Sequence, residues 1–153
     1  MIHTLPSNVI TRQQIVNFEA SLAQHARAFS PDDGMPPVHY FAQGVCGREI
    51  VIPAGVALAG RIHKQSQINV VSGLIEIASE QGRKLIDARA RPEIICTPAG
   101  TKRVGWAQTD TVWITFLGTD LTDPDEIYTT LTAATYEEYQ LFCNEQFKIE
   151  GKT

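Results

Sequence analysis

The fold of this chain follows from Pro53-Ala54-Gly55-Val56-Ala57-Leu58-Ala59-Gly60-Arg61-Ile62-His63-Lys64-Gln65-Ser66-Gln67-Ile68-Asn69-Val70-Val71-Ser72-Gly73. The stretch begins with a Pro-Ala-Gly turn, continues as a polar strand and ends in a Ser-Gly turn of the hairpin type. A second Pro-Ala-Gly turn follows at residues 98–100, again after an isoleucine-rich segment. The repeated turn predicts that the polar strand and the strand after the second turn face each other across a site.

Strand patterns surround this stretch on both sides. Between residues 38 and 118, short apolar runs alternate with turn signals about every 8 to 12 residues, which predicts about ten short strands. Such spacing favours an all-β sandwich or barrel over alternating strands and helices. We therefore expect residues 38–118 to form a β-barrel.

An amphipathic helix is predicted before the barrel, at residues 11–28. Thr11 and Gln14 fit a capping box, in which each side chain bonds a free backbone amide at the start of the helix. Apolar residues then recur at steps of three and four, which places them on one face. This apolar stripe consists of Ile15, Phe18, Leu22 and Ala26.

A helical segment is predicted after the barrel, at residues 123–148. Asp123 followed by Pro124 is typical of a helix start, and Thr135 begins a second capping box. The connections between these segments are short, so we expect residues 1–153 to form a single domain.

Composition restricts the class of protein. The net charge is −4 and 43% of the residues are hydrophobic, which indicates a globular chain and disfavours general nucleic-acid binding. No run approaches the roughly 20 apolar residues of a membrane span, and residues 1–8 lack the features of a signal peptide. The three cysteines lack the spacing of a metal site, so we expect reduced thiols and a cytoplasmic location.

The two turns and the polar strand resemble the motifs of the cupins, whose fold is a small double-stranded jelly-roll barrel. The family's motifs have the shapes G-x5-H-x-H-x3-4-E-x6-G and G-x5-P-x-G-x2-H-x3-N. The resemblance covers about residues 46–118 and implies a mainly β chain with a cupin barrel and helices at either end. The matching residues are His63, within one residue of register, and Gly73 in the first motif, and Pro98, Gly100 and Arg103 in the second.

The same comparison shows where this chain departs from the family. A metal-binding cupin supplies two histidines and a glutamate from the first motif and a histidine from the second. Here the first motif supplies His63, Gln65 and either Ser66 or Gln67, and the second supplies Arg103. An amide is a poor metal ligand, and a guanidinium has no lone pair to donate. We therefore predict no metal, no other cofactor and no metal-dependent reaction.

Period-two alternation predicts which polar residues meet inside the barrel. His63, Gln65, Gln67 and Asn69 share one face of the polar strand, and Arg103 follows the second turn. We expect these five residues to bind a ligand at the barrel mouth. One fixed positive charge among hydrogen-bonding groups suits a small polar or anionic molecule of the sugar, nucleotide or carboxylate class. The alternative is a closed network in which these groups satisfy each other.

Three functions stay open on these observations. The first is a metal-independent binding protein, in which His63 performs at most simple acid–base chemistry with a pKa lowered by Arg103. The second is a structural or assembly jelly roll whose surface packs on a partner. The third is a metal-dependent cupin enzyme that recruits His39 together with His63. The sequence leaves enzymatic activity uncertain and favours a protein without it.

Two further expectations come from resemblance alone. The cupin resemblance implies a homodimer. The run H-K-x3-I-N, with the later P-A-G-T-K-R turn, resembles small cupin-like proteins encoded by tailed bacteriophages. That likeness implies a location in the host cytoplasm or in the virion.

Overall fold

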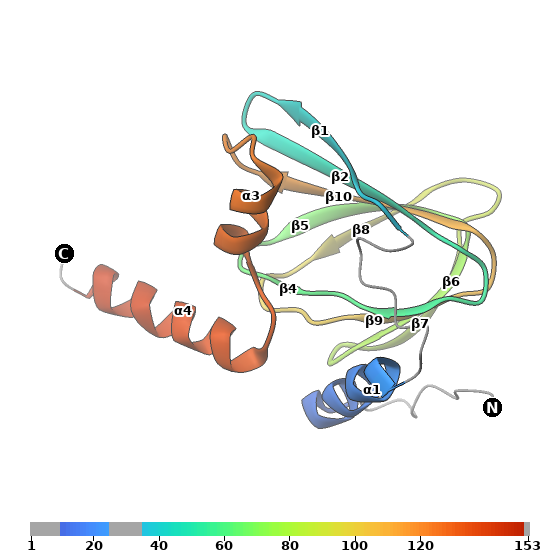
Figure 1. Ribbon diagram of the computed structural model, residues 1–153, viewed down its shortest axis with the longest axis horizontal. Helices are drawn as coiled ribbons and strands as arrows, with labels where there is room; N and C mark the ends of the chain where they lie inside the picture. Colours follow the sequence, from blue (N-terminus) through green and yellow to red (C-terminus); the bar gives the residue numbers. More distant parts are fainter. Residues whose placement is uncertain (1–9, 25–34, 152–153) are drawn as a thin grey trace.

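The computed structural model describes residues 10–24 and 35–151, whose strands form two facing antiparallel sheets (Figure 1). The larger sheet has the order β1-β2-β10-β5-β8, and the smaller has the order β3-β9-β6-β7. The larger sheet contains β1 (Val38–Ala42), β2 (Val45–Ile52), β10 (Thr111–Gly118), β5 (Gln67–Ser72) and β8 (Glu93–Thr97). The smaller contains β3 (Ala57–Ala59), β9 (Val104–Ala107), β6 (Leu74–Ser79) and β7 (Gly82–Asp87).

A third pairing ties the end of the chain to the middle of the polar strand. The short strand β4 (Ile62–His63) pairs with β11 (Thr132–Ala133), which lies between helices α3 (Pro124–Leu131) and α4 (Tyr136–Glu150). The backbone amide of Lys64 also donates to Leu131 O at 2.9 Å. The C-terminal segment thereby fixes the strand that carries His63.

The interior between the two sheets follows the alternation of side chains along each strand. In β5 the side chains of Gln67, Asn69 and Val71 are buried, whereas Ile68 between them is exposed. Successive side chains of a strand point to opposite faces, so each sheet turns one set of side chains toward the other sheet. The main apolar cluster therefore takes its members from both sheets. It includes Ile52, Val71, Ile75, Ile86 and Ala107.

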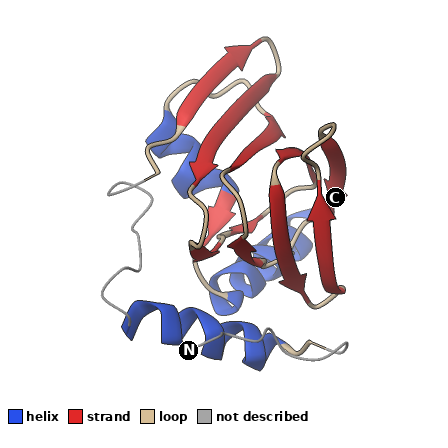
Figure 2. Ribbon diagram, turned by 90° about the vertical axis from the view of Figure 1, so that its right-hand side faces the viewer, coloured by secondary structure: helices blue, strands red, loops and turns tan. Residues whose placement is uncertain are grey.

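Helix α1 (Arg12–Gln24) lies outside the sheets against the smaller one (Figure 2). Ile15 is 1% exposed and packs with Val104 and Ala78. The predicted capping box forms, because Gln14 N donates to Thr11 Oγ1 at 3.2 Å and Thr11 N donates to Gln14 Oε1 at 2.9 Å. Residues 25–28 of the predicted helix lie outside the described residues.

The C-terminal helices begin at the predicted caps. Asp123 accepts from the backbone amides of Asp125 and Glu126, and Thr135 accepts from Glu138 N at 3.2 Å. Helix α4 continues to Glu150, two residues beyond the predicted segment, and projects away from the barrel in Figure 1. No helix in the described part of the chain has the length and apolar character needed to span a membrane.

The predicted mainly β fold class is confirmed: the described residues form two facing antiparallel sheets, with helices near both ends. One predicted strand is too long. The sequence pattern places a strand at 102–107, but β9 begins at Val104. The reason is that Lys102 turns its side chain into a buried polar site, where it is 2% exposed.

Candidate functional site

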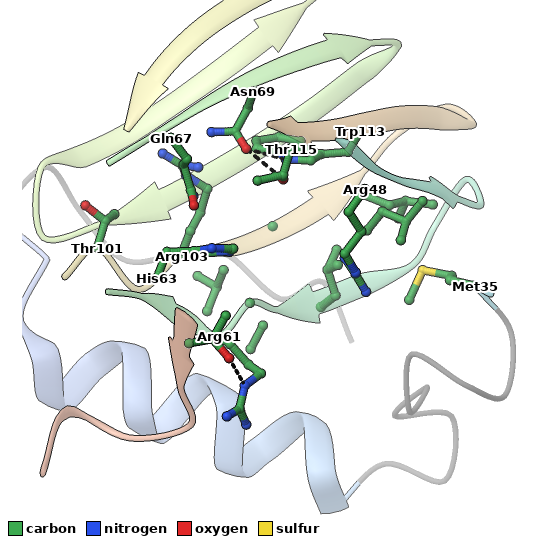
Figure 3. A pocket seen from close by; sticks show the side chains of 18 of the residues that line it. Met35, Arg48, Arg61, His63, Gln67, Asn69, Thr101, Arg103, Trp113 and Thr115 are labelled. Carbon is green, nitrogen blue, oxygen red and sulfur yellow. Dashed lines mark hydrogen bonds between the residues drawn. The ribbon is translucent and has the colours of Figure 1, made fainter. Parts of the chain in front are cut away.

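A cavity of ≈ 370 Å³ lies between the two sheets (Figure 3). Its walls come from β2, β5 and β10 on one side and from β3, β6 and β9 on the other, with contributions from α1, β4 and α3. In the view of Figure 3, His63, Gln67 and Arg103 lie toward one end, while Arg48 and Met35 lie toward the other. Much of the remaining lining is aliphatic: Ile50, Ile52, Leu58, Ile75 and Ile77.

His63 is held at the cavity by its backbone. It pairs with Thr132 across β4 and β11, and its carbonyl oxygen accepts from Gly100 N at 2.9 Å. Gly100 belongs to the second Pro-Ala-Gly turn, so this bond joins the turn to the polar strand. The imidazole Nδ1 is buried and has no hydrogen-bond partner.

The charge state of His63 follows from its surroundings. Burial, and to a smaller extent the guanidinium groups of Arg48, Arg103 and Arg61, together lower the pKa of its imidazole to about 4. An imidazole with this pKa is neutral at pH 7, and both its nitrogens are then available for one donated and one accepted bond.

Arg103 is half-buried beside this histidine. Its Nη2 donates to Thr97 Oγ1 at 3.1 Å, and its guanidinium lies 5.4 Å from the ring centroid of Trp113. Its Nε is buried and has no partner. Burial lowers the pKa of Arg103, but a guanidinium stays charged at neutral pH.

The charges that line the cavity are mostly positive. Arg61 donates from Nε to Thr132 Oγ1 at 2.8 Å and stacks over Tyr128, and Arg48 lies on the inward face of β2. Within the described ranges, Glu19 is the one carboxylate that lines the cavity, and it accepts from Lys102 Nζ at 3.0 Å. An anion that enters would therefore meet a positive potential.

Asn69 has its hydrogen bonds to the protein itself. Its Oδ1 accepts from Trp113 Nε1 at 3.0 Å and from Thr115 Oγ1 at 2.9 Å, and its Nδ2 donates to Thr97 Oγ1 at 2.9 Å. These bonds join β5 to β10 and β8 from inside the barrel. They correspond to the closed network that the sequence left open as an alternative, limited to this part of the site.

The structure brings together four of the five predicted site residues. His63, Gln67, Asn69 and Arg103 line the same cavity, whereas Gln65 does not. Gln65 instead donates from Nε2 to Gly118 O at 2.8 Å, because the chain bends at residues 64–65 and interrupts the strand alternation. Their role in ligand binding stays a prediction.

Sequence reasoning missed Arg48 as a cavity residue. It lies in β2 between Cys46 and Ile50, on the face of the strand that is otherwise apolar. A charged residue at an inward position of a strand was the available signal. Trp113 and Thr115 of β10 were missed for a different reason, since only the fold shows that β10 lies beside β5.

The side chains at the site do not fit the metal that the cupin resemblance implies. His63 is the single good ligand among the predicted site residues, and three guanidinium groups would repel a cation there. His39 also lines the cavity, yet across the described ranges no group of three or more His, Cys, Asp or Glu is placed to hold a metal ion. The alternative that pairs His39 with His63 lacks the carboxylates it would need.

No protein-family model and no curated protein matches the chain. Solved structures do match, at low identity. They include salicylate 1,2-dioxygenase from Pseudoaminobacter salicylatoxidans (12% identity, TM-score 0.49, covering 68% of this chain and 30% of that one). A cupin domain from Bordetella pertussis also matches, with 18% identity and a TM-score of 0.44, covering 56% of this chain and 94% of that one. A protein of unknown function from Streptococcus pyogenes matches with 16% identity and a TM-score of 0.44, covering 64% of this chain and 91% of that one. The chain thus spans about a third of the dioxygenase length.

Proposed function

We propose that this cupin-fold chain binds a small anionic molecule in the barrel cavity and does so without a metal ion. The observation that carries the proposal is the charge of the cavity lining. Arg48, Arg61 and Arg103 all line the cavity, and Glu19 is the one carboxylate among its described lining residues. An anion would be attracted to such a site.

The charge of the cavity selects an anion from the classes that the sequence left open. Within the described residues, neither Arg61 nor Arg103 forms an ion pair with a carboxylate. Guanidinium groups bind carboxylates and phosphates through charge-assisted hydrogen bonds. A carboxylate or phosphate at Arg103 would pair a charge that the protein leaves without a counterion.

A thermal-shift screen of carboxylates, phosphate esters and uncharged sugars tests the proposal. We expect anions to raise the melting temperature by about 5 °C or more at a concentration near 100 times Kd, and sugars to have no effect. Arg103→Gln should abolish the shift. Arg89→Gln is the control, since Arg89 pairs with Asp87 on the surface. Equal shifts in both variants would refute the site.

Removal of metal separates this proposal from a metal-dependent cupin. Dialysis against EDTA should leave ligand binding unchanged, and elemental analysis should find no stoichiometric metal. A stoichiometric transition metal whose removal abolishes binding would contradict metal independence.

A second candidate function is assembly, and one surface favours it. The outer face of the larger sheet exposes aliphatic and aromatic side chains on neighbouring strands, with Ile94 at 68% and Ile68 at 48% exposure. Contiguous apolar surface of this kind is typical of protein interfaces. We propose that this face binds a protein partner, and the simplest partner is a second copy of the chain.

A further inference from the structure

Part of the apolar surface between the two sheets is not covered by other protein atoms. Ile50, Leu58 and Trp113 line the cavity and pack against the main apolar cluster, yet all three are only partly buried. Ile50 faces inward, because its neighbour Val51 is 47% exposed on the opposite face of β2. Covering such surface with another apolar group is favourable. The cavity therefore favours a ligand with an apolar body.

At the end of the cavity where His63, Gln67 and Arg103 lie, the accessible polar atoms are donors (Figure 3). Arg103 Nη2 bonds Thr97 and Arg103 Nε is buried, which leaves Nη1 as the guanidinium nitrogen that is neither buried nor bonded within the described residues. In Gln67 the oxygen Oε1 is buried, so the donating Nε2 is the amide atom that keeps accessible surface. A ligand that binds at this end therefore has to supply acceptors.

Arg61 and His63 extend this set of donors. Arg61 Nε bonds Thr132 Oγ1, and its two terminal nitrogens are neither buried nor bonded within the described part of the chain. His63 Nδ1 has no partner in either tautomer, so the protein does not oppose the tautomer that carries its proton on Nε2. An ionised carboxylate has acceptors only, and it binds guanidinium groups through charge-assisted hydrogen bonds. Such a head group matches what these side chains offer.

The donors and the apolar surface adjoin each other. The guanidinium of Arg103 lies 5.4 Å from the ring centroid of Trp113, and Trp113 belongs to the apolar lining. A ligand that bonds Arg103 can therefore place its body against Trp113. Sugar or nucleotide hydroxyls on that body would lose hydrogen bonds to water, whereas an apolar body gains from burial. The volume of ≈ 370 Å³ is near the lower end of the usual ligand range of roughly 300–1,000 Å³, so the molecule is small.

We propose that the cavity takes a small aliphatic carboxylic acid in its ionised form. The carboxylate accepts from Arg103 and Gln67, and the aliphatic chain covers the apolar surface of Ile50, Leu58 and Trp113. This inference rests on the proposed function, namely that the cavity binds an anion, and it adds the head group and the body of that anion.

Calorimetric titration of the full chain with three matched compounds tests the inference. The probes are hexanoate, butanoate, which is two methylene groups shorter, and 1-hexanol, which lacks the carboxylate. We expect hexanoate to bind about 10-fold more tightly than butanoate, because it buries two more methylene groups. 1-Hexanol should show no binding at the same concentrations.

One pair of leucine variants tests the apolar body. Leu58→Phe places extra volume in the cavity, where the chain of the ligand would lie, so hexanoate should bind to this variant no more tightly than butanoate. Leu85→Phe is the matched control, because Leu85 is 55% exposed on β7 and does not line the cavity. That variant should keep the full preference for hexanoate. A preference that survives Leu58→Phe would overturn the assignment of the apolar body.

One pair of glutamine variants tests the head group. Gln67→Glu replaces a donor by a negative charge, so hexanoate should bind at least about 10-fold more weakly. Gln65→Glu adds the same charge outside the cavity, because the Gln65 amide bonds Gly118 O, and it should bind hexanoate as wild type does. Equal affinities of the two variants for hexanoate would overturn the assignment of the carboxylate to this end of the cavity.

The outcomes also separate this inference from the proposed function. If both acids bind wild type equally and both are lost in Arg103→Gln, the anion site stands and the aliphatic acid is excluded. The same holds if a phosphate ester binds and neither acid does. If 1-hexanol binds as well as hexanoate, or if no anion binds, both statements fail. The comparison of the three probes on wild type decides the matter even where a variant does not fold.

Discussion

At the scale of single residues, the buried His63 imidazole links the stability of the protein to pH. His63 must stay neutral in the folded chain, because burial and three guanidinium groups oppose its protonation. In the unfolded chain the same imidazole takes up a proton near its ordinary pKa of 6.5. The difference makes the stability of the protein depend on pH.

The sign follows from proton counting. Between pH 6.5 and about 4, the unfolded chain binds a proton at His63 that the folded chain does not, so the free energy of unfolding falls as the pH drops. The full loss is roughly 3 kcal/mol at most, from about 1.4 kcal/mol per pKa unit. Urea unfolding of wild type and His63→Gln across this window should show a flatter pH dependence in the variant. Parallel curves would mean that His63 titrates normally.

The two Pro-Ala-Gly turns provide a matched pair of glycines. Gly55 and Gly100 have φ of 83° and 81°, a region that favours glycine. A Cβ at Gly55 would meet nothing within 4 Å, whereas a Cβ at Gly100 would lie 2.6 Å from Tyr139 Cε1. Both alanine variants incur backbone strain of about 1 kcal/mol, and Gly100→Ala adds overpacking of about 1–3 kcal/mol. Chemical denaturation should rank Gly100→Ala as the less stable variant, and equal losses would contradict the contact.

At the scale of elements, one buried lysine joins three separate parts of the chain. Lys102 Nζ donates to Glu19 Oε1 of α1 at 3.0 Å, to Gly60 O before β4 at 3.3 Å, and to Ala134 O before α4 at 3.1 Å. The second Pro-Ala-Gly turn is thereby linked to the N-terminal helix and to the C-terminal segment. This arrangement also accounts for the late start of β9.

Replacement of this lysine should destabilise the protein strongly. Lys102→Met keeps the volume but leaves two partly buried carbonyls without their donor, with an expected loss of about 2–4 kcal/mol in the free energy of unfolding. Glu19→Gln is the control, because this side chain is 44% exposed and keeps an acceptor oxygen, so its loss should stay below about 1 kcal/mol. Urea denaturation measures both. Equal losses of unfolding free energy in the two variants would contradict a stabilising role for the hydrogen bonds of Lys102 Nζ.

At the scale of the whole molecule, the apolar outer face of the larger sheet predicts a dimer. Light scattering after size exclusion should give about twice the monomer mass of 16.9 kDa. Ile94→Glu places a charge on that face and should give a folded monomer, with a melting temperature lowered by the loss of association. Leu85→Glu is the control, because Leu85 is 55% exposed on β7 of the smaller sheet. A monomeric wild type would contradict the proposed assembly.

Local patterns in the chain were sufficient for much of the architecture. Turn glycines, strand alternation and helix caps depend on neighbours within a few residues, so they could be read from the order of residues. The capping box at Thr11 formed as expected, and Thr135 caps α4 by accepting from Glu138 N, while the Glu138 carboxylate accepts from Ala134 N. Four of the five predicted site residues reached one cavity, and two of them, Gln67 and Asn69, did so for the same reason, since they alternate along β5.

The rest depended on contacts between distant segments, which alternation cannot show. The second Pro-Ala-Gly turn bonds the polar strand, since Gly100 N donates to His63 O. Lys102, just after this turn, donates hydrogen bonds to Glu19 in α1 and to Ala134 before α4. Asn69 became a joint between strands because β10 lies beside β5, and Gln65 left the site because the chain bends before β5. Long-range pairing and burial decide which polar groups keep unsatisfied hydrogen bonds, and so which of them remain available for a ligand.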